Sequence, residues 1–268
     1  MKIFTKGLRR FSAGVTVGLI LFSRPHFMQI NPNYLALAAL AAGLQAAVAA
    51  DITGTVTLNG TPPEEKLNQL IADDPNCGKL HTEPVYTQFY VVGPNKGLKD
   101  VVVYITNVKG KSTGATAEPV VLDQKGCEYN PYIFAVQTGQ KILVRNSDPG
   151  PTLSHNVHDL PKVAGNKEMN QAQAAGAPDL TMSFPMPEDF LTFKCDVHAW
   201  MFSYVTVVDS PYFAVTGKDG SFKIANVPPG KYTVQAMHRK ANGGKPVMKE
   251  IEVKDGNANL DFTMDVPK

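Results

Sequence analysis

Four side chains in the C-terminal half of the chain have the types and spacing of a metal-ligand set. Cys195, His198 and Met201 follow one another at intervals of three residues, and His155 lies forty residues before the cysteine. A thiolate, two imidazoles and a thioether together make a type 1 copper site, because imidazole suits Cu(II) and soft sulfur suits Cu(I). Such a site changes oxidation state with little rearrangement. The predicted chemistry is therefore one-electron transfer at one copper ion per chain.

The spacing by itself also fits simpler interpretations. A lone cysteine near a histidine is often a buried thiol or half of a zinc pair. His158, three residues after His155, could replace it as ligand, join it, or lie at the surface or beside the site. The other histidines, His26, His81 and His238, lie in separate segments. Cys-x-x-Cys does not occur, which excludes c-type haem attachment and the dithiol motif of thiol redox proteins.

The segments around these residues predict β-strands in a particular order. Residues 120–146 have the pattern strand, crossover, strand, tight turn, strand; residues 191–195 lead into the ligand segment, and residues 204–208 follow it. From residue 118 to residue 208 this order resembles the cupredoxins, and plastocyanin above all. The resemblance implies a Greek-key β-sandwich that holds a single copper ion.

The resemblance also implies a role for each residue of the site. It assigns four ligands: the thiolate of Cys195, the equatorial imidazoles of His155 and His198, and the weak axial thioether of Met201. The backbone N–H of Asn156 is expected to donate to the cysteine sulfur and so to tune the metal. Only two residues separate His198 from Met201, where the family leads one to expect four. Whether Met201 or His158 completes the site therefore stays open.

The rest of the chain predicts short strands separated by Gly and Pro, so the fold class is all-β. Residues 219–234, DGSFKIANVPPGKYTV, resemble the carboxypeptidase regulatory-like domain, a small transthyretin-like or Ig-like β-sandwich, and residues 52–60 and 98–105 match its first half more weakly. We expect the cupredoxin segment to be inserted into this second sandwich; a tandem order is the alternative. The expected division is an export segment 1–50, first sandwich part 51–107, cupredoxin 108–209 and second sandwich part 210–268.

The first 50 residues predict an export signal. They contain five basic and no acidic residues, and an Ala/Leu-rich run ends in small residues before Asp51. An uncleaved anchor is the alternative, but neither apolar run reaches the roughly 20 residues that span a bilayer. We therefore expect cleavage near residue 50, a periplasmic or extracellular protein, and no transmembrane helix in the mature chain.

Removal of the first 50 residues leaves 21 basic and 24 acidic side chains, a net charge of −3. The mature chain has no basic footprint for nucleic acid and no P-loop or dinucleotide fingerprint.

With Cys195 assigned to metal, Cys77 and Cys127 are left as a disulfide pair in an oxidising compartment; two free buried thiols are the alternative. In the chain-entropy model the bridge contributes about 4 kcal/mol to stability. Leu67, Leu70 and Ile71 predict a short helix over residues 63–72.

Three classes of function remain. The first is an exported one-electron carrier whose partner is a protein such as a c-type cytochrome or a membrane oxidoreductase. The second is a copper storage or delivery protein, and the third is a surface binding module. An enzyme is not expected, because copper nitrite reductases and multicopper oxidases need further histidine-rich sites and only five histidines follow residue 50. Trp200 and Phe202, on either side of Met201, are candidates for an apolar docking patch, and core packing is the alternative for Trp200.

Overall fold

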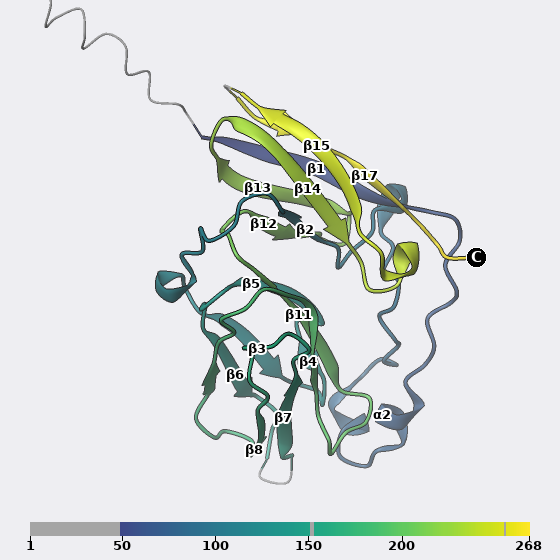
Figure 1. Ribbon diagram of the computed structural model, residues 1–268. Helices are drawn as coiled ribbons and strands as arrows, with labels where there is room; N and C mark the ends of the chain where they lie inside the picture. The colour runs from purple at the N-terminus through teal and green to yellow at the C-terminus, as the bar shows by residue number, and fades with distance from the viewer. Residues whose placement is uncertain (1–48, 151–152, 255) are drawn as a thin grey trace, which may run out of the picture. The chain divides into compact units, whose positions relative to one another are not determined.

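β-Strands form almost all of the regular structure of this protein. The structure is a computed structural model that describes residues 49–150, 153–254 and 256–268, and these residues belong to one compact unit. The predicted all-β fold with two β-sandwiches is confirmed, because four sheets enclose two separate hydrophobic cores (Figure 1). Most of the predicted export segment, residues 1–48, lies outside the described residues. In the part of the chain that is described, no helix has the length and hydrophobicity of a membrane span.

The first sandwich is built from both ends of the described chain. One sheet has the order β13–β1–β16, with β17 also paired to β1, and the facing sheet has the order β12–β2–β14–β15. The bounds are β1 Ala50–Asn59, β2 Val102–Ile105, β12 Phe213–Val215, β13 Ser221–Val227, β14 Gly230–Met237, β15 Val247–Val253, β16 Ala258–Asn259 and β17 Phe262–Asp265. Every strand partner of β1 and β2 within the described residues comes from the C-terminal part.

The sequence of β1 explains how this sandwich forms. Ile52, Val56 and Leu58 are buried and alternate with polar residues, which is the period of two expected of a strand with one face on a core. Gly54 occupies the one inward position without a side chain. A Cβ there would lie 2.1 Å from the carbonyl oxygen of Leu260, so the close approach of these two backbones requires glycine.

The second sandwich is formed by the central segment alone. Its larger sheet has the order β5–β11–β10–β7–β8 and its smaller sheet the order β4–β3–β6–β9. The bounds are β3 Val120–Gln124, β4 Tyr129–Asn130, β5 Ile133–Gln137, β6 Ile142–Asn146, β7 His155–Leu160, β8 Asn170–Gln173, β9 Leu180–Met182, β10 Glu188–Lys194 and β11 Phe202–Val208. Leu122, Phe134, Val144 and Phe193 are buried between the two sheets.

Strand pairing in the larger sheet brings the predicted ligands to one end of the sandwich. β10 pairs antiparallel with β7, with Lys194 opposite His158, so the end of β10 meets the start of β7. β10 and β11 form a hairpin in which Lys194 lies opposite Phe202. Cys195, His198 and Met201 therefore all belong to the loop that closes this hairpin, and His155 begins the neighbouring strand.

A disulfide joins the long connection between β1 and β2 to the second sandwich. Cys77 and Cys127 are bonded, with a Cα–Cα distance of 5.7 Å, which confirms the predicted pair. The helix predicted over residues 63–72 is wrong in extent, because α2 spans only Gln69–Asp73. The preceding residues instead make strand-like backbone contacts: Leu67 bridges to Tyr86, and the N–H of Asn68 donates to the carbonyl of Val85 at 2.8 Å. Long-range pairing of the backbone outweighs the local helical pattern here.

His238 gives the first sandwich a measurable pH dependence. Its ring is buried, and Nδ1 accepts hydrogen bonds from the backbone N–H groups of Lys240 and Ala241 at 3.2 and 2.9 Å. Burial, with a smaller contribution from the charge of Arg239, lowers the pKa of His238 from 6.5 to about 4. The folded protein therefore holds this ring neutral, whereas the unfolded chain takes up a proton below pH 6.5.

We predict that the free energy of unfolding has its full contribution from His238 above pH 6.5, where the ring is neutral in both the folded and the unfolded chain. This contribution is lost as the pH falls through about 4, because the unfolded chain takes up the proton first. The loss is on the order of 3 kcal/mol, since each tenfold change in proton affinity is worth about 1.4 kcal/mol. Urea unfolding at a series of pH values measures it, and His238→Asn, which keeps an acceptor but cannot titrate, is the comparison. Parallel curves for the two proteins between pH 7 and 4 would contradict the prediction.

Candidate metal centre

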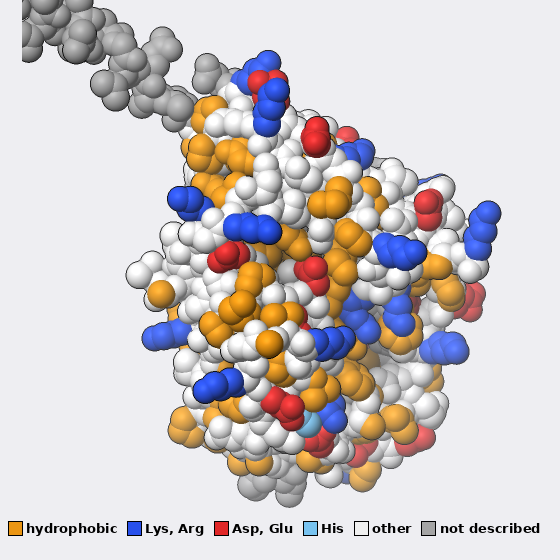
Figure 2. Space-filling view, viewed as in Figure 1, with side chains coloured by type: hydrophobic (Ala, Val, Ile, Leu, Met, Phe, Trp, Pro, Cys, Tyr) orange, Lys and Arg blue, Asp and Glu red, His pale blue; other side chains and the backbone are white. Residues whose placement is uncertain are grey.

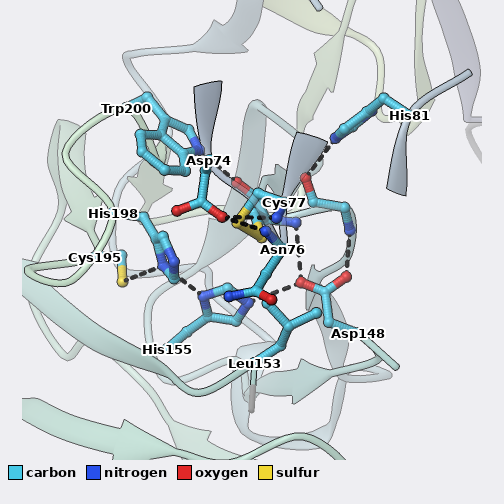
Figure 3. Close-up of a disulfide and its surroundings, with 12 residues drawn as sticks. Asp74, Asn76, Cys77, His81, Asp148, Leu153, His155, Cys195, His198 and Trp200 are labelled. Carbon is cyan, nitrogen blue, oxygen red and sulfur yellow. Dashed lines mark hydrogen bonds and ion pairs between the residues drawn. A yellow bond between two sulfur atoms is a disulfide. The ribbon is translucent and has the colours of Figure 1, made fainter. Parts of the chain in front are cut away.

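Three buried side chains bring potential metal-ligand atoms together at the end of the second sandwich. The Sγ atom of Cys195 and a ring nitrogen of each of His155 and His198 lie within 4.8 Å of one another. Nδ1 of His155 is 3.0 Å from Nδ1 of His198, and Nδ1 of His198 is 3.7 Å from the cysteine sulfur. Figure 3 shows the three side chains in a continuous row of contacts. The exposed fractions are 1% for His155, 3% for Cys195 and 8% for His198.

These separations fit a shared metal ion. Metal–nitrogen bonds are about 2.0 Å and metal–sulfur bonds about 2.3 Å in tetrahedral protein sites, so two ligands of one ion lie about 3 to 4 Å apart. Two imidazoles and one thiol, with no carboxylate among the three, form a donor set that suits copper. The residues that converge here therefore fit the cofactor predicted from the sequence.

The ligand loop is held closed by its own backbone. The N–H of Cys195 donates to the carbonyl of Met201 at 3.1 Å, and the N–H of Met201 donates to the carbonyl of His198 at 3.0 Å. The Met201 side chain is buried in the same hydrophobic core as Cys195. Cys195, His198 and Met201 are thus all buried residues of one short loop.

Asp148 orients one of the imidazoles. Nε2 of His155 donates to Oδ2 of Asp148 at 2.8 Å. The carboxylate is itself buried and also accepts the backbone N–H groups of Gly126 and Cys127. A histidine that binds metal through one nitrogen usually donates its other N–H to a carboxylate or carbonyl, which fixes the ring and its tautomer. Because Nε2 of His155 is hydrogen-bonded to Asp148, Nδ1 is the nitrogen that faces the cluster.

The cluster favours a thiolate at Cys195. Burial by itself raises the pKa of this thiol, but hydrogen bonds from His155, His198 and the N–H of Asn156 outweigh burial and lower the pKa to about 5. Burial lowers the pKa of His155, whereas Asp148 and Cys195 raise it to about 9. At neutral pH the metal-free site therefore contains an ion pair, and the thiolate is already the form that binds metals. A metal ion held here would take the place of the proton on Nδ1 of His155.

Asn156 fixes the position of the sulfur. Its backbone N–H donates to Sγ of Cys195 at 3.5 Å, the contact that the cupredoxin resemblance implies. Its side-chain Oδ1 accepts the N–H of Asp196 at 2.6 Å. Asn156 therefore contacts the loop at the sulfur itself and at the residue that follows it.

His158 lies outside the cluster. Successive side chains of β7 point to opposite faces, so a residue three positions after His155 faces away from it. Nδ1 of His158 is 2.8 Å from Asp196 and Nε2 is 2.9 Å from Glu168, so carboxylates contact both ring nitrogens. Hydrogen bonds to these carboxylates raise the pKa of His158, the contact with Glu168 contributing most. The structure thus places His158 in a hydrogen-bond network beside the loop.

The disulfide lies next to the metal cluster. Its two sulfur atoms and a ring nitrogen of His198 lie within 4.8 Å of one another. Nε1 of Trp200 donates to the carbonyl of Cys127 at 2.9 Å, and the Trp200 ring lies 5.0 Å from the His198 ring, centroid to centroid. Trp200 packs partly buried against the core of the second sandwich and against a smaller cluster formed by the disulfide, Ile71 and Leu153. Phe202 is 36% exposed. The disulfide and Trp200 together cover His198.

Comparison with known proteins gives partial similarities. Residues 211–266 match the family described as BOS complex subunit NOMO1-like, second beta sandwich domain. The match agrees with the expected β-sandwich in this part of the chain. The family expected from the sequence was a different one, the carboxypeptidase regulatory-like domain. No curated protein matches the chain.

Among solved structures, similarity to cupredoxins is weak. The copper-containing nitrite reductase NirK from Thermus scotoductus SA-01 is 18% identical, with a TM-score of 0.30, over 38% of this chain and 25% of that chain. A methionine-to-alanine mutant of amicyanin in its Cu(I) form is 18% identical, with a TM-score of 0.29, over 39% of this chain and 97% of that chain. The similarity thus spans a quarter of the nitrite reductase and nearly all of amicyanin.

We predict that Asp148→Asn weakens copper binding by about 10- to 100-fold, the usual effect of losing a group that orients a ligand. The amide keeps only one of the two acceptor oxygens, and it no longer holds His155 with a charge. A competition titration against a copper chelator measures the change. Asp179→Asn is the matched control, because Asp179 is paired with Arg145 at the surface of the same sandwich. Equal affinity of Asp148→Asn and Asp179→Asn would contradict the role given to Asp148.

Proposed function

We propose that this chain is an exported protein with one type 1 copper ion that transfers single electrons. The observation that supports the proposal is the buried convergence of Cys195 Sγ with Nδ1 of His155 and of His198, with His155 held by Asp148. Copper, when bound, would supply a single one-electron couple. Met201, buried in the core beside Cys195, is the proposed axial ligand.

The burial of the three converging side chains favours electron transfer over catalysis or copper delivery. A catalytic metal keeps a coordination position open to its substrate, and a delivery protein must release its ion to a partner. Here none of the three converging side chains is more than 8% exposed, so neither a substrate nor an accepting ligand reaches the cluster directly. An electron needs no such access. The proposal is therefore a carrier and not an enzyme, with storage or delivery of copper as the less favoured alternative.

The thiolate, the imidazoles and the scaffold have separate tasks in this proposal. Cys195 supplies negative charge that is already present at neutral pH, because its pKa is lowered to about 5. Asp148 and Asn156 hold His155 and the sulfur in place before and after a change of oxidation state. A site that is held in one arrangement needs little reorganisation when an electron arrives.

Partner and location are also part of the proposal. We propose a redox protein, such as a c-type cytochrome or a membrane oxidoreductase, that docks over Trp200 and Phe202 at the edge of the ligand loop. The disulfide supports a periplasmic or extracellular location, because such bridges persist in oxidising compartments. Insertion of residues 108–209 into a sandwich made of 51–107 and 210–268 would hold the copper segment at both ends.

We predict that Met201→Leu retains copper and raises its reduction potential. An apolar side chain donates no electrons to the metal and so disfavours Cu(II). A tenfold change in the relative binding of the two oxidation states moves a one-electron potential by about 59 mV, and we expect a shift of at least this size in protein-film voltammetry. Met182→Leu is the matched control, because Met182 packs against the same core from β9. The same potential in Met201→Leu and in the unmodified protein would remove Met201 from the site, and the lack of any reversible couple would contradict electron transfer.

A further inference from the structure

A groove of about 580 Å³ runs beside the ligand loop. On one side it is bordered by Trp200, Met201 and Phe202, and on the other by α2 and the segment around Phe89. Its volume is within the range of about 300 to 1,000 Å³ that small-molecule sites occupy. Figure 2 shows hydrophobic side chains next to lysine and arginine side chains on the face where α2 and β11 lie in Figure 1.

Aromatic and aliphatic side chains form the walls of this groove. Its aromatic lining consists of Tyr86, Phe89, Tyr129, Tyr132, Trp200, Phe202 and Tyr204. Several apolar groups on its outer wall are open to solvent: Leu70 is 56% exposed, Tyr86 51% and Phe89 40%. Exposed apolar side chains that line one groove are typical of a binding site. Flat rings on both sides favour a flat occupant, because aromatic rings stack or pack edge to face.

The charged residues of the groove are mainly positive. Lys66, Arg239 and Lys240 line it, whereas Glu128 is the one acidic residue in its described lining, and burial raises the pKa of Glu128. The neighbouring Glu65 carboxylate is not part of the lining, and it accepts the backbone N–H groups of Phe89 and Tyr90. The charge of the groove therefore complements an anion.

The cations lie against the aromatic walls. Cζ of Arg239 lies 3.4 Å from the centroid of the Tyr204 ring, and its guanidinium donates to the hydroxyl of Tyr132. Nζ of Lys240 lies 4.5 Å from the centroid of the Phe89 ring. Positive charge and flat apolar surface are thus available to the same molecule.

We propose that this groove binds a small planar aromatic molecule that bears an anionic group, such as an aromatic carboxylate. The rings of the occupant would pack between the aromatic walls, and its anion would pair with Lys66 and Lys240. The occupant would contact Trp200 and Met201, and so would lie against the ligand loop. Its binding requires only the folded groove and is independent of any bound metal.

Trp200 provides a direct readout, because it lines the groove and is the one tryptophan in the sequence. The metal-free full-length protein is titrated with 4-nitrobenzoate, a planar anion that quenches tryptophan fluorescence. We expect saturable quenching. The isosteric neutral compound 4-nitrobenzamide and the cation 4-nitrobenzylammonium are the matched ligands. Both are expected to bind at least about fivefold more weakly, because they lack the two partly exposed charge contacts with Lys66 and Lys240.

The double variant Lys66→Gln/Lys240→Gln should weaken 4-nitrobenzoate binding by about fivefold and leave 4-nitrobenzamide unaffected. Lys167→Gln/Lys218→Gln, at exposed positions outside the groove lining, is the control and should bind like the unmodified protein. Leu70→Glu, at an exposed position of α2, should abolish binding without unfolding the chain. Quenching that never saturates, equal binding of the amide and the carboxylate, or equal weakening in the control variant would each overturn the proposal.

Discussion

The candidate site depends on the hydrogen bonds that the buried carboxylate of Asp148 accepts. This carboxylate accepts hydrogen bonds from His155 and from the backbone of Gly126 and Cys127. A buried charge costs several kcal/mol unless it is paired and hydrogen-bonded, so these three donors are needed together. The same carboxylate thus connects the turn that bears the disulfide to the imidazole that faces the cluster. It fixes the ring of His155 and the turn at Cys127 in one arrangement.

The position of Asp148 explains why the disulfide and the cluster of Cys195, His155 and His198 lie side by side. Cys127 donates its N–H to Asp148, accepts a hydrogen bond from Trp200 through its carbonyl, and is bonded to Cys77. The connection between β1 and β2 is thereby attached over His198. That attachment buries His198 and forms the outer wall of the groove that Trp200 and Met201 border.

The sequence was sufficient to predict the main strands and three residues that converge, His155, Cys195 and His198. Period-two burial in β1 and the order of strands around Cys195 follow from apolar patterning. The approach of His155 to Cys195 follows once β7 and β10 are paired. The pairing of Cys77 with Cys127 followed from assigning the third cysteine to metal.

Other features depended on contacts between distant segments and left little signal in the sequence. Asp148 comes seven residues before His155 after a predicted strand, and nothing in that spacing marks it as the partner of the ring. The helix expected over residues 63–72 is reduced because Leu67 and Asn68 make backbone contacts with residues 85 and 86. The groove joins side chains from five separate stretches of the chain, so no local pattern could reveal it.

The most direct test of a thiolate-bound copper is the optical and EPR spectrum of the protein loaded with one equivalent of Cu(II), with Cys195→Ser as control. We expect a strong visible band near 600 nm, or a shifted red or green variant, as for a copper–thiolate bond. We also expect a small copper hyperfine splitting and the loss of both features in the serine variant, whose hydroxyl is not deprotonated as a thiol is. A weak band with wide splitting that Cys195→Ser leaves unchanged would mean ordinary nitrogen and oxygen ligation, and would contradict the type 1 site.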